Sequence, residues 1–191
     1  METGRPGGKA GEVKGIRRAG IWELALRVAA LGLTLVAAVV LRTDDQNTTF
    51  VLQVSPVLPR LNIPVTAKWH YLSSFLYFVV ANAVACAYAA LSLLLLLILR
   101  RGGGKAADMV TALITISDVM MVALLFSSCG ATTAVGILGR EGNSHVKWGK
   151  VCNVFGRFCH RVSIALSLSF IGSFGFFLLA ALAVVGLHRR P

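Results

Sequence analysis

The stretch Met109–Leu138 reads MVTALITISDVMMVALLFSSCGATTAVGIL and contains a single formally charged residue, Asp118. A run of about 20 apolar residues is enough to cross a bilayer, so this segment is long enough to span one with tilt or with an extension beyond it. A carboxylate inside such a segment is costly and needs a partner, a water-filled cavity or a proton. The stretch therefore predicts a membrane helix and makes the surroundings of Asp118 the central question.

The composition of the whole chain indicates an integral membrane protein. Of the 191 residues, 56% are hydrophobic and only 14% are charged, and the mean hydropathy is +0.74. A soluble domain of this size rarely has such a composition. The formal net charge of +11 lies in short tails and loops between apolar runs. Membrane flanks explain this charge more simply than nucleic-acid binding does, and we expect no nucleic-acid partner.

The pattern of apolar runs predicts an all-α membrane protein, a bundle of four transmembrane helices. We expect helices at about 21–41, 72–99, 109–138 and 162–187, all within one membrane domain of residues 21–187. Outer loops are expected at about 42–71 and 139–161. Residues 1–20 are expected to form a disordered basic tail and residues 188–191 a second short tail. Three prolines in the first loop, Pro56, Pro59 and Pro64, argue against one continuous helix and against a central strand there.

The distribution of basic residues predicts the orientation of the bundle. The side that carries both termini has 10 basic residues and the opposite side has 8, so the positive-inside rule places the termini in the cytoplasm by a small margin. The sequon Asn47-Thr48-Thr49 falls on the side that would then be extracellular, which makes Asn47 a candidate for N-glycosylation.

Arg27 is the candidate partner of Asp118. It lies inside the apolar segment LALRVAALGLTLVAAVVL, residues Leu24–Leu41. The first and third helices start on the same side, where Arg27 would lie about 7 Å deep and Asp118 about 15 Å deep at the α-helical rise. A long arginine side chain spans much of that offset, and pairing would lower the cost of both charges. Thr34, Thr115 and Ser117 are candidates for further hydrogen bonds.

Other interpretations of the two charges remain open from the sequence. Arg27 could snorkel to the lipid headgroups without any partner. Asp118 could be a neutral, protonated carboxyl bonded to a neighbouring helix, or a proton or cation site of a small channel or proton-coupled carrier. Such a site is usually accompanied by further carboxylates or by broken helices. The four predicted helices contain no proline and no second acidic residue at depth, which favours a structural ion pair.

The four cysteines divide into two groups. Cys86 and Cys129 fall within predicted helices, where a cysteine is usually a small apolar side chain. Cys152 and Cys159 fall in the second outer loop, where an oxidising compartment would favour a disulfide. On a regular helix their Cα atoms would be about 10 Å apart, beyond the roughly 7 Å that a disulfide allows. Either the loop turns between them, for which Gly156 is placed, or they pair between chains.

Catalytic and metal-binding motifs are not apparent. The sequence lacks a phosphate-binding glycine loop, a nucleophile elbow and a strong metal motif, so we expect no enzyme activity and no cofactor. A zinc site from Cys152, Cys159, His145 and His160 is possible by ligand type, but the spacing fits no tight signature. The basic residues of the second loop are either solvated or bind an acidic wall polymer or a lipid headgroup. Gly172 and Gly175 do not form GxxxG, and they favour close packing or a kink.

The chain resembles the Casparian strip membrane domain protein family, in particular the CASP-like proteins of land plants. The resemblance covers residues 21–187 and rests on RVAALGLTLVAAVV, YFVVANAVACAYAALSL, the serine- and glycine-containing fourth helix and, most specifically, GREGNSHVKWGKVCNVFGRFC. By this resemblance Arg27 and Asp118 occupy the charged positions of the family, and Cys152 and Cys159 its loop cysteines. The family is also similar to the four-helix MARVEL proteins of animal membrane junctions.

The resemblance implies a non-enzymatic scaffold of the plasma membrane. Members of that family form homo-oligomers and hetero-oligomers, make stable membrane domains and, in one branch, recruit cell-wall enzymes. The strip-forming members carry a short signature in the first outer loop, and VLQVSPVLPRLNIPVTAKWHY does not contain it; building the strip itself is therefore outside what the resemblance implies. The alternatives are a channel or carrier that uses Asp118 and an accessory subunit of another membrane complex.

Overall fold

The computed structural model of the chain describes residues 7–52, 61–99, 105–145 and 149–188. The long helices are α1 (Gly7–Arg42), α2 (Ser73–Leu99), α3 (Lys105–Glu141) and α4 (Gly156–His188). Each contains a segment long and apolar enough to cross a membrane: Gly20–Arg42, Ser73–Ile98, Met109–Glu141 and Gly156–Gly186. The prediction of an all-α bundle with four transmembrane helices is thus confirmed.

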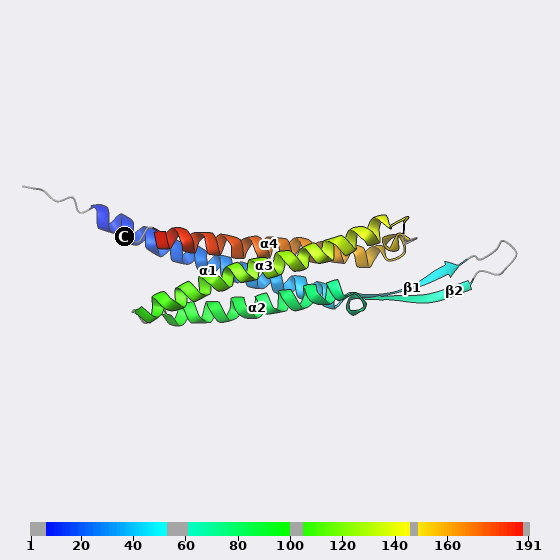
Figure 1. Ribbon diagram of the computed structural model, residues 1–191. Helices are drawn as coiled ribbons and strands as arrows, with labels where there is room; N and C mark the ends of the chain where they lie inside the picture. Colours follow the sequence, from blue (N-terminus) through cyan, green and yellow to red (C-terminus); the bar gives the residue numbers. More distant parts are fainter. Residues whose placement is uncertain (1–6, 53–60, 100–104, 146–148, 189–191) are drawn as a thin grey trace, which may run out of the picture.

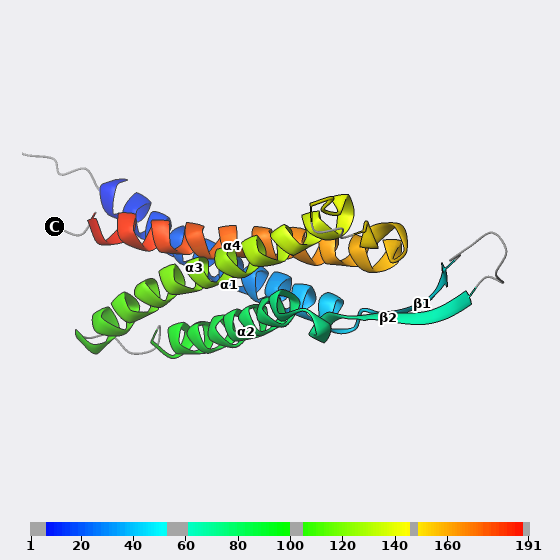
Figure 2. The same ribbon diagram turned by 45° about the vertical axis from the view of Figure 1, so that its right-hand side comes forward.

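The four helices form a ring in chain order. Helix α1 packs against α2 and α4, and α3 packs against α2 and α4, so α1 lies diagonally opposite α3 and α2 lies opposite α4. The start of α1 and the end of α4 lie at one end of the bundle, and the β-strands project from the other (Figure 1). We call these the terminal end and the hairpin end. Turned by 45°, the bundle shows α2 and α3 together separating from α1 and α4 toward the terminal end (Figure 2).

Along α1, α2 and α4 a row of buried residues runs at steps of three or four, which is typical of a left-handed bundle. Helix α1 buries Arg27, Ala30, Thr34, Ala37 and Leu41, α2 buries Asn82, Ala85, Ala89 and Ser92, and α4 buries Ala165, Ser169, Ser173, Phe176 and Ala180. Most of these residues are small, so the helix axes can approach closely. At Gly172 a Cβ would lie 3.3 Å from Cγ2 of Thr34, which makes Gly172 a close-packing position between α4 and α1.

Several helix ends differ from the predicted ones. Helix α1 begins at Gly7, so the expected disorder of residues 1–20 is wrong for residues 7–20; residues 1–6 lie outside the described part. Adding turns to an existing helix avoids the cost of nucleation, so the early glycines do not stop it. Helix α4 begins at Gly156 rather than 162, and α3 extends to Glu141. Gly142, at φ 72°, ends α3 in the left-handed conformation that glycine favours.

A two-stranded antiparallel hairpin occupies the first loop, which the sequence did not predict. Strands β1 (Asp45–Leu52) and β2 (Leu61–Lys68) pair from Asp45 opposite Lys68 to Leu52 opposite Leu61. Pro64 lies in β2 opposite Thr49. In a hairpin both strands are edge strands, which accept proline, so the argument against a central strand and the presence of this hairpin are compatible. Pro56 and Pro59 lie outside the described residues.

Candidate functional site

Arg27 and Asp118 meet in the interior of the bundle. Nη2 of Arg27 lies 2.9 Å from Oδ2 of Asp118, and Nη1 lies 3.1 Å from Oδ1. Arg27 is 2% exposed and Asp118 is fully buried. This two-pronged geometry is the strongest form of a carboxylate–guanidinium contact. The structure therefore brings together the two charges that the sequence singled out, and Arg27 does not snorkel.

Two residues of α2 complete this group, which we call the charged layer: Arg27, Asp118, Tyr88 and Ser92. The Tyr88 hydroxyl lies 2.8 Å from both Oδ1 of Asp118 and the carbonyl oxygen of Ile114. Nη1 of Arg27 also donates to the Ser92 hydroxyl at 2.9 Å. Glu23, one turn before Arg27, lies 3.7 Å from Nη2 and is partly exposed. The charged layer thus joins three helices and gives both carboxylate oxygens of Asp118 a donor.

The ion pair crosses a diagonal of the ring. Helices α1 and α3 are not neighbours in the ring of four, yet the long side chain of Arg27 reaches from one to the other. A diagonal contact lies inside the bundle, and the side chains of both partners are buried there. The pair therefore fixes the distance and the register between α1 and α3. Without it, these two helices would be positioned only through their contacts with α2 and α4.

A second polar group crosses the other diagonal, and we call it the neutral layer: Asn82, Cys129 and Ser169. The Ser169 hydroxyl donates to Oδ1 of Asn82 at 2.9 Å, and the Cys129 thiol donates to Ser169 at 3.3 Å. Nδ2 of Asn82 donates to the carbonyl of Phe78 at 2.9 Å. All three side chains are fully buried. On α2 this layer lies six residues before Tyr88, or about 9 Å toward the hairpin end.

The hydroxyl groups that we expected beside the ion pair are used elsewhere. Thr34 donates to the carbonyl of Ala30, and Thr115 donates to the carbonyl of Thr111, each within its own helix. The prediction that they support the ion pair is wrong, because a threonine in a helix readily satisfies its hydroxyl at the carbonyl four residues earlier. Ser117 is only half-buried.

Sequence reasoning missed Tyr88, Ser92, Asn82 and Ser169. A usable signal exists in α2, where Asn82, Ala85, Ala89 and Ser92 follow each other at steps of three, four and three. A polar residue in register with small residues at these steps lies on the packed face of a membrane helix, where it needs a hydrogen-bond partner. The identity of that partner depends on the helix arrangement, which one sequence does not supply.

Cys152 and Cys159 form a disulfide within the chain at the hairpin end. Their Cα atoms are 5.8 Å apart, which is possible because the chain leaves a short 3₁₀ turn at Val151–Asn153 and enters α4 at Gly156. This is the turn that the sequence allowed as one of two options. Disulfide-bonded cysteines offer no thiolates, and the described residues contain no cluster of three or more metal-binding side chains. The zinc alternative therefore has no support.

The remaining candidates lie at the same end. Asn47 is exposed in β1, opposite Thr66 of β2, so its side chain is accessible; its glycosylation stays a prediction. Asp44, which is 1% exposed, contacts the partly exposed Arg161 at 3.3 Å. This contact links the end of α1 to the first turns of α4.

Both cysteines of the helices are free thiols. Cys129 belongs to the neutral layer, and Cys86 is half-buried.

Comparison with known proteins identifies relatives over most of the chain. Residues 17–175 match the Casparian strip membrane protein domain. CASP-like protein 1E2 of Vitis vinifera is 54% identical over 88% of this chain and 85% of its own length. CASP-like protein 1E1 of Glycine max is 52% identical over 90% and 89%, and CASP-like protein 1E1 of Arabidopsis thaliana is 43% identical over 95% and 90%. No solved structure matches the chain.

Proposed function

The chain belongs to the Casparian strip membrane protein family, and we propose that it is a non-enzymatic scaffold that assembles with copies of itself or of related members in the plasma membrane. It is a multi-pass membrane protein of four spans. The relatives named above carry no enzyme name. Local recruitment of cell-wall enzymes belongs to the same proposal.

The observation that best supports the proposal is that Asp118 is buried and paired within the charged layer. Within the described spans, Asp118 is the only acidic residue more than one turn from a span end. Both of its oxygens accept hydrogen bonds from Arg27, and one also accepts from Tyr88. A carrier needs a carboxylate that can exchange its proton or ion with water. Asp118 is fully buried and occupied by a fixed cation, so it serves structure, and the carrier alternative is not favoured.

The outer surface of the bundle suits lateral assembly. Only 17% of the most apolar window of α3 is buried within the chain, against 33–39% for the other three spans. Helix α3 therefore presents the broadest apolar face to lipid or to another copy. A bundle cross-linked internally by two polar layers keeps that face rigid, which reduces the entropy lost on association.

The placement of the hairpin end outside the cell is also part of the proposal. A disulfide within a loop persists in an oxidising compartment, and Cys152–Cys159 lies at the hairpin end. Both termini would then be cytoplasmic. The hairpin and the second loop would face the wall, where partner enzymes act.

Assembly can be tested by single-molecule photobleaching of the fluorescently tagged full chain in plant plasma membrane. We expect several bleaching steps per spot, and mixed spots when a differently coloured relative is co-expressed. A tagged single-span protein at the same density supplies the control for chance overlap. Spots that bleach in one step at every density would contradict the proposal.

A further inference from the structure

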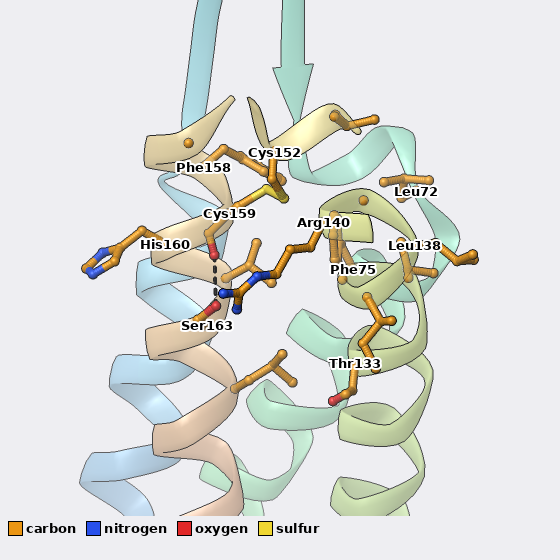
Figure 3. A pocket seen from close by; sticks show the side chains of 18 residues that line it. Leu72, Phe75, Thr133, Leu138, Arg140, Cys152, Phe158, Cys159, His160 and Ser163 are labelled. Carbon is orange, nitrogen blue, oxygen red and sulfur yellow. Dashed lines mark hydrogen bonds between the residues drawn. A yellow bond between two sulfur atoms is a disulfide. The ribbon is translucent and has the colours of Figure 1, made fainter. Parts of the chain in front are cut away.

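A cavity of about 480 Å³ opens at the hairpin end, between α2, α3 and α4. Its size falls in the range of ordinary ligand pockets, roughly 300–1,000 Å³. It lies away from both polar layers, and none of their residues lines it. Figure 3 shows the cavity with the disulfide Cys152–Cys159 in its wall. This cavity therefore needs an explanation of its own.

The interior of the cavity is apolar. Its deep wall is made by the buried side chains of Phe75, Phe158 and Val162. Ile137 and Leu138 line it as well and are 53% and 39% exposed, so the cavity is continuous with the surface that faces lipid. The hydroxyls of Thr133 and Ser163 already donate to helix carbonyls at 2.7 Å and 3.0 Å. The cavity therefore suits a hydrocarbon chain better than a polar solute.

One end of the cavity carries a cation. Arg140, in the last turn of α3, extends toward α4 over the cavity (Figure 3). It is exposed, and it takes part in none of the ion pairs between the described residues. A guanidinium in this position can hold a phosphate by two parallel hydrogen bonds.

The charges around Arg140 are mainly positive. The second-loop region carries Arg140, Lys150 and Arg157, all exposed, against the acidic Glu141, while Arg161 is paired with Asp44. This balance attracts anions to the hairpin end. An apolar cavity that is open to lipid and carries at one end an arginine without an ion pair among the described residues complements the shape and charge of an amphiphile with an acidic head.

The depth of the cavity agrees with such a ligand. On α3 its lining runs from Thr133 to Arg140, which is about 10 Å along the helix. The apolar segment of α3 that could cross a membrane ends at Glu141, so we infer that Arg140 lies near the headgroups and that the apolar lining lies deeper. A lipid can therefore place its headgroup on Arg140 and its chain in the cavity without leaving the bilayer.

We propose that this cavity binds the acyl chain of an anionic membrane lipid, with the acidic headgroup against Arg140. This inference goes beyond the scaffold proposal and holds whether or not the chain assembles with other copies. An uncharged lipid or a second copy of the chain are the competing occupants, and the experiment below separates them.

The full chain is reconstituted in nanodiscs of phosphatidylcholine with a minor share of phosphatidylglycerol. Either lipid carries a photoactivatable group on its acyl chain, and labelled peptides are identified by mass spectrometry. We expect the peptides that contain Thr133–Arg140 and Phe158–Leu166 to be labelled about threefold more by phosphatidylglycerol, the scale of a partly exposed ion pair.

Two matched pairs of variants separate the headgroup from the chain. Arg140→Gln should remove the preference for phosphatidylglycerol, whereas Arg157→Gln, which removes an exposed charge of the same loop region outside the cavity, should keep it. Ser163→Trp should reduce labelling by both lipids because it fills the cavity. Ser167→Trp should not, since Ser167 does not line the cavity; it lies one turn further along α4, is also exposed and makes the same kind of hydrogen bond to its own helix.

Three results would overturn the proposal. Equal labelling by both lipids would show that only uncharged hydrocarbon fills the cavity. Equal effects of Arg140→Gln and Arg157→Gln would show that the preference comes from the overall positive charge of the loop region and not from Arg140 at the cavity. Labelling of other membrane-facing peptides by both lipids, with none in these two peptides, would show that lipid does not occupy the cavity and would leave a second copy as its occupant. Since Arg140 and Ser163 are exposed, the substitutions leave the buried core intact.

Discussion

The charged layer and the neutral layer both join opposite helices of the ring, the first through an ion pair and the second through hydrogen bonds between neutral groups. Each crosses a diagonal of the ring: Arg27–Asp118 joins α1 to α3, and Asn82–Ser169 joins α2 to α4. Removing one charge leaves the other unpaired in a medium that solvates it poorly, whereas removing one neutral group leaves only a hydrogen bond unmade. We therefore expect substitutions in the charged layer to lower the free energy of unfolding strongly. Substitutions in the neutral layer should lower it only slightly.

Asp118→Asn should have the largest effect, because it leaves the buried Arg27 guanidinium with only the partly exposed Glu23, 3.7 Å away, as a counter-ion. We expect a loss of about 3–5 kcal/mol in the free energy of unfolding, measured by titration with a denaturing detergent. Glu23→Gln is the matched control, since Glu23 lies 3.7 Å from the same guanidinium but is partly exposed; its effect should stay below about 1 kcal/mol. Comparable losses for the two variants would show that burial of the acidic partner is not what makes the ion pair costly to break.

Asp44→Asn should have the next largest effect. Asp44 is as buried as Asp118, but its partner Arg161 is partly exposed and can turn to water. We expect a loss of about 2 kcal/mol in the same titration, within the range for a buried group that loses a charged hydrogen bond. A loss as large as that of Asp118→Asn would show that depth in the membrane is not what makes the charged layer costly to break.

Asn82→Ala should cost about 1 kcal/mol, since it leaves the Ser169 hydroxyl without its acceptor. Asn82→Asp sharpens the comparison, because it places a carboxylate in the neutral layer, whose three members include no basic side chain. It should therefore destabilise the bundle more than Asn82→Ala does. The detergent titration of both variants checks this order, and the reverse order would contradict the neutral character of that layer.

Tyr88→Phe should have the smallest effect, about 0.6 kcal/mol, the average for a hydrogen bond inside a membrane protein. Asp118 loses one donor but keeps both bonds to Arg27. Tyr77→Phe is the control on the same helix, because its exposed hydroxyl makes only a 3.4 Å contact with Ser127. A thermal unfolding scan should separate Tyr88→Phe from Tyr77→Phe. A loss for Tyr88→Phe near that of Asp118→Asn would show that the Tyr88 hydroxyl matters as much to the charged layer as the ion pair does.

The charged layer could be predicted from the sequence because lone charges in apolar segments have few explanations. Arg27 and Asp118 are the only charged residues more than one turn inside their described spans, and depth from the helix ends placed them in one leaflet. Asn82 and Ser169 carry no such signal, since polar neutral residues are common in membrane helices and only the arrangement of α2 and α4 selects the pair. The four spans could be predicted from the sequence equally well, because the length of an apolar segment alone defines them.

The loops and helix ends were harder to predict. The hairpin of β1 and β2 has no hydrophobic alternation across a tight turn signal, and its prolines argued for irregular structure. The start of α1 at Gly7 depends on propagation from the membrane span, which local propensity does not include. The cavity at Arg140 is lined by residues from 133–166 and by Leu72 and Phe75, which are distant in sequence. It depends on how α2 packs against α3 and α4, so no single stretch indicated it.

The most direct test of this account is the charge exchange Arg27→Asp with Asp118→Arg. Surface expression and unfolding in detergent are measured for both single variants and for the double variant. If the pair is a structural link across the bundle, each single variant fails and the double variant recovers part of the loss, because opposite charges again face each other across the diagonal. If Asp118→Asn or either single exchange is expressed, folded and assembled like the unchanged chain, the link between α1 and α3 does not hold the bundle together.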